Sequence, residues 1–147
     1  MSDARNEPDS LRRPPAKFAP PSRQHSTAGP YSPVLEVDAR TLVVISGQAA
    51  VDLDGNIASQ DIAEQSTLTL ENCRNQLAAA GCTFADVFKV NVYMKDLAQW
   101  AEFNSVYAGI MEEPLPVRTA IQAGLLEGLL VEVEMWAAKN RGADAAP

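Results

Sequence analysis

The chain carries VFKVNVYM at residues 87–94, and this stretch decides the fold because its side chains alternate in character. Successive side chains of a β-strand point to opposite faces, so the alternation predicts a strand with one buried face. We expect the buried set to be Phe88, Val90, Val92 and Met94. A strand of this kind belongs to a sheet that is covered on one side.

A helix and two further strands follow this stretch. Apolar residues recur at three- and four-residue steps over 97–111, which predicts an amphipathic helix, and Pro114 and Pro116 end it. Residues 117–122 and 130–137 predict two strands joined through a glycine-containing link. These two strands are able to pair as a hairpin centred near Leu125.

The residues before the central strand supply another helix and two strands. Asp61 begins a helix of about twenty residues that Gly81 ends. Residues 34–37 and 42–46 predict a hairpin. The resulting order, β-β-α-β-α-β-β, predicts an α+β layer sandwich in which a mixed sheet carries two helices on one face. Apolar and aromatic side chains are frequent on the other face, so we expect other subunits to cover it.

Length and composition predict one folded domain with extensions. The chain has 147 residues, 46% of them apolar, which is typical of one ordinary core. Residues 1–28 contain half of the ten prolines and few large apolar side chains, so we expect an arm that is extended or disordered. We assign the folded domain to residues 29–140 and expect a flexible tail at 141–147. Removal of residues 1–25 should leave the fold intact.

Charge and residue usage exclude several classes of function. Lys and Arg number 12 against 19 Asp and Glu, and the net charge of −7 opposes binding to nucleic acid or anionic membranes. Cys73 and Cys82 suit neither a secreted disulfide scaffold nor a zinc site, and the apolar stretches are too short to cross a membrane. A cytoplasmic protein is therefore predicted. His25 is the only histidine and no phosphate loop occurs, so we expect no metal and no cofactor.

Charged residues inside strands are the clearest candidates for chemistry. Arg118 lies near the start of a predicted strand, and Glu132 and Glu134 share one face of the last strand. In the predicted hairpin, Arg118 faces Glu132. A guanidinium binds a carboxylate through two contacts, and a carboxylate can orient water or move protons. The alternative is a structural Arg–Glu ion pair at the sheet edge.

Three other signals are weaker. Ser46-Gly47 closes a predicted strand, where a hydroxyl and a bare backbone either approach a ligand or mark a strand exit. Tyr31 lies in Gly-Pro-Tyr-Ser-Pro, which is either a turn alone or a ligand wall. Asn104 interrupts an apolar helix stripe and is either a satisfied core amide or a site residue.

Seven short motifs occur along the chain, each loose by itself and specific in its order and spacing. They are GPYS at 29–32, ISGQ at 45–48, AAAGC at 78–82, VNVYMKD at 90–96, FNSVY at 103–107, PVRT at 116–119 and VEVE at 131–134. Together they resemble the RidA family of imine and enamine deaminases, also called YjgF/YER057c/UK114. The resemblance covers residues 26–139.

The resemblance implies a chorismate-mutase-like fold and a homotrimer whose sheets enclose a barrel, with three sites in clefts between subunits. It also implies a reaction without a cofactor. By the matching motifs, Arg118 binds the substrate carboxylate and Glu132 handles water. The remaining substrate contacts map to Tyr31, Ser46, Gly47, Asn104 and Ala120. Family members often carry cysteine where this chain has Ala120, so its backbone serves instead.

The implied function is hydrolytic deamination of reactive imine or enamine acids of the 2-aminoacrylate and 2-iminopropanoate type, which gives a 2-oxo acid and ammonia. One alternative substrate is a larger enamine from aromatic-ring degradation, such as 2-aminomuconate. Another alternative is a binding or chaperone-like trimer without turnover. Family members also carry ribonuclease labels, which the acidic charge opposes. The expected partners are a small carboxylate-bearing substrate and further copies of the chain.

Overall fold

The computed structural model describes residues 16–25 and 29–140. It contains two α-helices, α1 (Ile62–Ala79) and α2 (Trp100–Ile110). The main strands are β3 (Thr41–Gln48), β4 (Val87–Met94), β5 (Val117–Gln122) and β6 (Val131–Lys139). Two-residue strands and single 3-10 turns complete the set: β1 (Lys17–Phe18), β2 (Glu36–Val37), η2 (Phe84–Asp86) and η3 (Leu97–Gln99).

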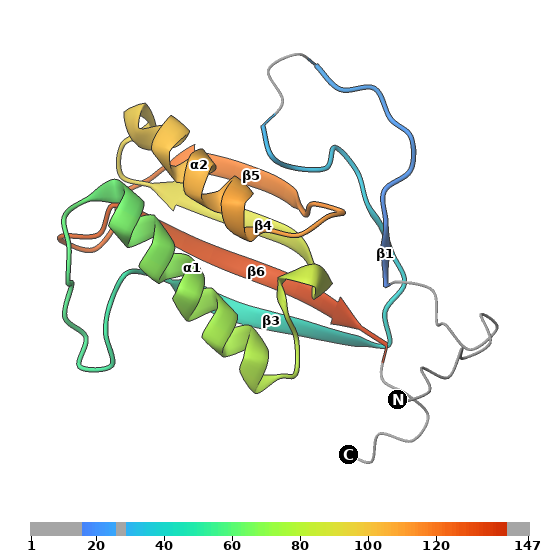
Figure 1. Cartoon of the computed structure of the whole chain (residues 1–147), viewed down its shortest axis with the longest axis horizontal. Helices are drawn as coiled ribbons and strands as arrows, with labels where there is room; N and C mark the ends of the chain where they lie inside the picture. The colour runs from blue at the N-terminus through green and yellow to red at the C-terminus, as the bar shows by residue number, and fades with distance from the viewer. Residues whose placement is uncertain (1–15, 26–28, 141–147) are drawn as a thin grey trace, which may run out of the picture.

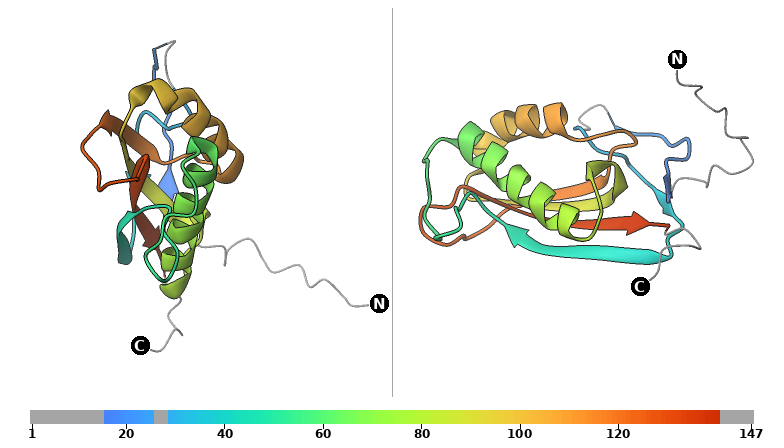
Figure 2. Two further views of the ribbon diagram at one scale, coloured as in Figure 1. Left: turned by 90° about the vertical axis from the view of Figure 1, so that its left-hand side faces the viewer. Right: turned by 60° about the horizontal axis from the view of Figure 1, so that its bottom comes forward.

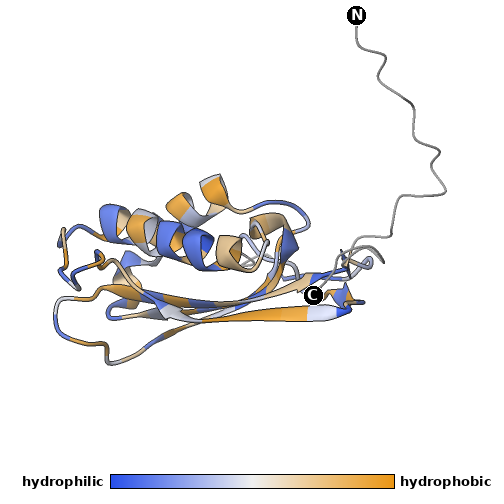
Figure 3. Ribbon diagram, turned by 90° about the horizontal axis from the view of Figure 1, so that it is seen from below, coloured by the Kyte–Doolittle hydropathy of each residue, from blue (hydrophilic) through white to orange (hydrophobic). Residues whose placement is uncertain are grey.

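The elements form two layers. The four-stranded sheet has the order β3-β6-β4-β5, and both helices lie on one of its faces (Figures 1 and 2). The other face carries no helix of the described chain (Figure 3). The predicted α+β sandwich with two helices on one face is therefore confirmed, and the predicted element order holds except for the additional two-residue strand β1. The predicted trimer stays a prediction.

The central strand is β4, as its alternation predicted, with one local difference. Val90, Val92 and Met94 have no exposed surface and face the helices. A bulge interrupts the pairing with β6 between Val87 and Lys89. The extra residue shifts the alternation by one, so Val87 joins the core and Phe88 is only half-buried. The prediction that Phe88 lies in the buried set was wrong for this reason.

The predicted hairpin between the last two strands was also wrong. β5 pairs in parallel with β4, and β6 pairs antiparallel with the other edge of β4. A strand, helix and strand in succession favour parallel neighbours, because the helix returns the chain to the same end of the sheet. The link over residues 123–130 is long enough to take the chain past the end of β4.

The second predicted hairpin is replaced by two separate pairings. β2 pairs with β1, whereas β3 pairs antiparallel with β6. The β-branched pattern of both segments was interpreted correctly, but their partners come from the two far ends of the chain. β3 pairs with β6 instead of with its sequence neighbour β2, because β6 provides a long antiparallel edge.

The helix signals were accurate for α1. Asp61 caps its N-terminus by accepting a hydrogen bond from the Glu64 backbone at 2.9 Å. Gly81 follows its C-terminus with a φ of +72°, a backbone conformation that favours glycine. Leu70, Cys73 and Leu77 of α1 are completely buried in the core. The helix predicted for 97–111 is divided into η3 and the shorter α2.

The described part of the predicted arm is extended and buries one side chain, that of Lys17. β1 and β2 place Lys17 opposite Val37, and the Lys17 side chain is only 4% exposed. The composition of the arm did not indicate this contact. The rest of the predicted arm (1–15 and 26–28) and the predicted tail (141–147) lie outside the described residues.

Neither α1 nor any other helix in residues 16–25 and 29–140 is long and apolar enough to cross a membrane. This finding concerns membrane-spanning helices alone. The cytoplasmic location stays a prediction.

The burial of Cys73 predicts an unreactive thiol. Neither Cys73 nor Cys82 forms a disulfide within the described residues, and burial raises the pKa of Cys73 to about 12. Since the thiolate is the reacting species, we expect native protein at mildly alkaline pH to resist a disulfide reagent, while denatured protein reacts at once. Time-resolved labelling with mass-spectrometric assignment measures this. Reaction of native Cys73 at the rate of the denatured thiol would contradict its burial.

Candidate functional site

Arg118 lies under α2 within a cage of three aromatic rings. Its guanidinium carbon is 4.7 Å from the ring centroids of both Trp100 and Tyr107, and 5.6 Å from that of Tyr31. All three distances fall within the range of cation–π attraction. The rings attract the cation through their electron-rich faces, so they stabilise a buried charge without using its N–H groups. We call these four residues the arginine cluster.

The donors of Arg118 are the chemically important part of the cluster. Its Nη1 and Nη2 atoms are buried and have no hydrogen-bond partner in the described part of the chain. Burial lowers the pKa of Arg118, and the nearby Tyr107 and Tyr31 hydroxyls oppose that shift. A guanidinium stays protonated even so, because its ordinary pKa lies far above neutral pH. The cluster therefore presents a charged fork whose shape matches a carboxylate.

The loop that carries Tyr31 is attached to the segment before Arg118. The Ser32 backbone donates to the Pro116 carbonyl at 3.1 Å, and its hydroxyl donates to the Leu115 carbonyl. A Cβ atom at Gly29 would lie 3.1 Å from Nη2 of Arg118, so the loop backbone closely approaches the guanidinium. The structure thus brings the predicted residues Tyr31 and Arg118 together.

Two further polar groups on α2 are buried near this cluster. The Asn104 Oδ1 atom and the Tyr107 hydroxyl have no hydrogen-bond partner among the described residues. Asn104 lies on the helix face that also carries Trp100 and Tyr107, since residues three and four apart are neighbours on a helix. Burial raises the pKa of Tyr107, so its hydroxyl stays protonated. Unpaired buried polar groups are rare; besides Ser66 and Thr69 on α1, those among the described residues are Asn104, Tyr107 and the Arg118 guanidinium.

Glu132 belongs to a second group, which we call the glutamate cluster: Gly47 and Glu132. A Cβ atom at Gly47 would lie only 2.3 Å from the Glu132 Oε1 atom, so the carboxylate lies against the bare backbone of β3. The pairing of β3 with β6 is irregular between Ile45 and Gln48, which is where this contact occurs. Ser46 is exposed.

The two clusters lie on opposite faces of the sheet. Arg118 is paired with buried Val90, on the helix face, whereas Glu132 is paired with Tyr93, on the face without helices. Residues directly opposite in a ladder share a face, and Val90 and Tyr93 are three apart on β4, which places them on different faces. The predicted Arg118–Glu132 contact within one chain was wrong, because β4 separates their strands.

Glu134 differs from Glu132 in its hydrogen bonds. One Glu134 carboxylate oxygen accepts from the Tyr93 hydroxyl at 2.6 Å and from the Asn91 amide at 3.0 Å. The hydrogen bond to Glu134 is the main cause that raises the pKa of Tyr93. Glu134 is therefore already engaged by two side chains of its own chain on the face without helices.

Ala120 lies two residues after Arg118 on the same strand, and it is paired with buried Val92 on the helix face. Its side chain is half-buried against the core. The structure thus places Ala120 on the side of the arginine cluster, as the predicted substrate contact requires, and opposite to Glu132.

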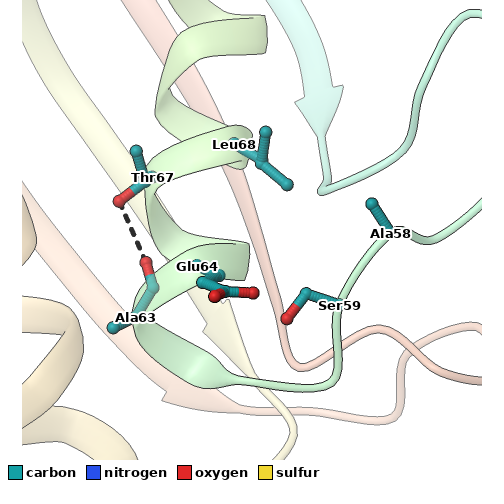
Figure 4. A pocket seen from close by; sticks show the side chains of 6 residues that line it. All are labelled: Ala58, Ser59, Ala63, Glu64, Thr67 and Leu68. Carbon is teal, nitrogen blue, oxygen red and sulfur yellow. Dashed lines mark hydrogen bonds between the residues drawn. The ribbon is translucent and has the colours of Figure 1, made fainter.

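A hollow of about 440 Å³ lies elsewhere, beside the first turns of α1 (Figure 4). Small and apolar side chains dominate its wall, which consists of Ala58, Ser59, Ala63, Glu64, Thr67 and Leu68. The Thr67 hydroxyl is already occupied by the Ala63 carbonyl at 3.0 Å. No predicted site residue lines this hollow. Within 16–25 and 29–140, no three His, Cys, Asp or Glu side chains are grouped so as to hold a metal ion.

A family model described as Endoribonuclease L-PSP matches residues 22–139. The chain belongs to the RidA (YjgF/YER057c/UK114) family. Its fold is the chorismate-mutase-like fold of that family, and the solved RidA from the Antarctic bacterium Psychrobacter sp. PAMC 21119 superposes with a TM-score of 0.64 at 32% identity. That alignment covers 78% of this chain and 92% of the other.

Curated relatives of this RidA-family chain include both deaminases and proteins named otherwise. Human 2-iminobutanoate/2-iminopropanoate deaminase is 37% identical over 108 residues, which are 72% of this chain and 77% of that protein. Schizosaccharomyces pombe protein mmf2, named as mitochondrial, is 37% identical over 122 residues, which are 80% of this chain and 94% of that protein.

Trp100 and Tyr107 are the cluster residues that sequence reasoning missed. Both were interpreted only as members of an apolar helix stripe. Their signal was present in the amide of Asn104, which lies between them on the same stripe. A polar group at the centre of an aromatic helix face indicates a buried polar neighbour, but only the packing of α2 on β5 identifies it as Arg118.

The Gly47 contact predicts a substitution that acts on Glu132 alone. In Gly47→Ala, the new methyl group displaces the Glu132 carboxylate, and we expect kcat to fall by about tenfold if that carboxylate positions water. Gly109→Ala is the matched control, because a Cβ at Gly109 meets no atom within 4 Å. Steady-state kinetics of both variants on a 2-imino acid measure the difference. Equal kcat values in the two variants would show that Glu132 does not take part in the reaction.

Proposed function

We propose that this chain is a cofactor-independent deaminase that hydrolyses 2-imino acids and their enamine tautomers to 2-oxo acids and ammonia. The observation that carries the proposal is the buried Arg118 guanidinium, whose Nη1 and Nη2 atoms have no partner within the described chain. A buried charge with free donors is costly unless a ligand of opposite charge completes it. A 2-imino acid supplies such a charge in its carboxylate, and relatives named as deaminases act on this class of compound.

The opposite faces of the two clusters support a site between copies of the chain. Arg118 lies on β5, one edge of the sheet, and the glutamate cluster lies toward β3, the other edge. In a cyclic assembly, different surfaces of neighbouring copies meet, so the β5 edge of one copy approaches the β3 edge of the next. We propose a homotrimer closed in this way. Exposed apolar residues on the open sheet face, Leu42 at 61% and Val44 at 60%, support burial against other copies.

The reaction follows from the groups present. Arg118 holds the substrate carboxylate, which orients the adjacent C2 atom of the imine. Glu132 of a neighbouring copy accepts a proton from water while the water oxygen bonds to C2 and the C=N electrons pass to nitrogen. Glu132 returns this proton to the nitrogen of the resulting carbinolamine. The C–N bond then breaks and ammonia leaves, while the hydroxyl group gives its proton to Glu132 and the C=O bond of the 2-oxo acid forms. Protonation of an enamine at C3 gives the same imine.

Two other functions, RNA cleavage and ligand binding without turnover, would give different results in an assay. Nucleolytic activity is suggested by the name of the family model, but a net charge of −7 opposes binding to a phosphate backbone. A trimer without turnover would bind the carboxylate and release no 2-oxo acid. A coupled assay tests these outcomes. A second enzyme generates 2-aminoacrylate or 2-iminobutanoate in the presence of the purified protein, and 2-aminomuconate and a labelled RNA are tested as substrates in parallel. Accelerated 2-oxo acid release from the small imines supports the proposal, and its absence would reject it.

Arg118→Lys tests the carboxylate receptor. Lysine keeps the charge but loses the planar two-point contact, which is worth roughly 1.5–3 kcal/mol, so kcat/KM should fall by about tenfold or more. The matched control is Arg74→Lys, since Arg74 also lies over a ring, that of Phe84 at 5.1 Å, on α1. Kinetics and thermal melting are measured on both. An active but destabilised Arg118→Lys protein would show that Arg118 has only a structural role.

Glu132→Gln tests the proton acceptor. The amide keeps the shape of the side chain but cannot take a proton from water, so we expect a similar KM and a kcat lower by about a hundredfold. Glu134→Gln is the comparison, because Glu134 is engaged by Tyr93 and Asn91. If Glu134→Gln loses turnover and Glu132→Gln keeps it, the roles of the two carboxylates are reversed.

The proposed assembly predicts a particle of three chains of 15.8 kDa in sedimentation. Val44→Glu places a charge on the open sheet face and should dissociate the particle and abolish turnover together. Leu53→Glu is the control, because Leu53 is fully exposed on a turn away from the sheet. A monomeric wild-type protein with full activity would overturn the site between copies.

A further inference from the structure

Lys17 is a buried lysine at the start of the described chain. Its side chain is 4% exposed, and its Nζ atom donates to the carbonyl oxygens of Val87 and Pro114, each at 2.7 Å. Lysine is almost never fully buried unless its charge is paired or bound. Burial lowers the pKa of Lys17, and the carboxylates of Asp86, Glu112 and Glu113 oppose that shift. A buried amine held by two carbonyls is a specific anchor.

The two carbonyls belong to different parts of the sheet. Val87 begins β4, and Pro114 lies in the link between α2 and β5, four residues before Arg118. Lys17 therefore connects the start of the central strand to the segment that leads into the arginine cluster. The pairing of β1 with β2 holds the other side of Lys17, and the Asp38 backbone adds a hydrogen bond to the Ala16 carbonyl at 2.7 Å.

The link before Arg118 depends on its carbonyl groups. Pro114 and Pro116 have no N–H group, so they cannot donate backbone hydrogen bonds. The carbonyl oxygens of residues 114, 115 and 116 all accept hydrogen bonds from residues nearer the N-terminus. Lys17 donates to the first, and the hydroxyl and backbone N–H of Ser32 donate to the second and the third. Lys17 and Ser32 thus hold one continuous stretch of backbone, and Tyr31 beside Ser32 covers the guanidinium that follows it.

We propose that Lys17 is a positioning residue for Arg118, acting through the 114–116 backbone to hold the guanidinium for the substrate carboxylate. The functional part of this inference rests on the proposed deaminase function. Lys17 lies before residue 22, where the family match begins, so the anchor is outside the matched region. The N-terminal segment accordingly contributes to substrate binding without touching the substrate.

Lys17→Met tests the inference, with Lys139→Met as the matched control. Lys139 also donates to a backbone carbonyl, that of Ala80, but at the far end of α1, away from Arg118. Methionine keeps the apolar length of the lysine stem and removes the ammonium. Hydrogen exchange of peptides spanning 111–120, KM and kcat for a 2-imino acid, and the melting temperature are measured on both variants and the wild type.

We expect Lys17→Met to accelerate exchange in 111–120 and to raise KM by about tenfold, with kcat changed by less than about twofold. Lys139→Met should lower the melting temperature without either effect. The inference is overturned if Lys17→Met leaves exchange in 111–120 and KM unchanged, or if Lys139→Met changes them equally. Should Lys17→Met not fold, Lys17→Gln retains a donor and undergoes the same measurements.

The exchange measurement requires no substrate, so it separates the two proposals. If the wild-type protein does not hydrolyse 2-imino acids, the proposed function fails, and faster exchange in Lys17→Met alone still supports the anchor. If the wild type is active and Lys17→Met is indistinguishable from it, the proposed function stands and the anchor fails.

Discussion

The pairing of β4 with β5 on one side and β6 on the other governs the rest of the molecule. Because β4 lies between them, the last two strands never meet, and the register on β4 determines which face each of their side chains takes. Arg118 takes the face beneath the helices, and Glu132 takes the open face. A single chain therefore holds both charged groups that the proposed chemistry uses and keeps them apart. Because of this separation, the proposed reaction requires Arg118 of one copy and Glu132 of another.

Aromatic rings solve a difficulty that a buried guanidinium creates. A carboxylate partner inside the chain would stabilise Arg118 strongly, but it would also occupy the donors that a substrate needs. Trp100, Tyr107 and Tyr31 attract the cation through their ring faces and leave its edge free. The remaining desolvation cost is borne by the folded protein, and a bound carboxylate would offset it. Under the proposed function, the folded protein is less stable at this position and binds the substrate carboxylate more tightly in return.

The residues near the N-terminus hold the backbone that leads to Arg118. In the 114–116 segment both prolines lack an N–H group, and the Leu115 N–H donates only to the Glu113 carboxylate of the same link, so its attachment to the rest of the protein depends on donors from elsewhere. Ser32 and Lys17 supply them, and both residues precede β2 in the chain. The proline-rich composition of the first residues suggested an arm with little to bury, and one side chain, Lys17, changes that interpretation.

The sequence by itself determined the elements and the candidate residues. Alternation identified β4, capping residues bounded α1, and charged residues within strands marked Arg118 and Glu132, because these signals depend on a few neighbouring residues. The tertiary structure decided the partners. Both predicted hairpins were wrong, since strand pairing depends on crossover geometry and on edges contributed from distant parts of the chain. The bulge at Phe88, the aromatic cage and the Lys17 anchor likewise arise from contacts between residues far apart in sequence, for which local periodicity carries no information.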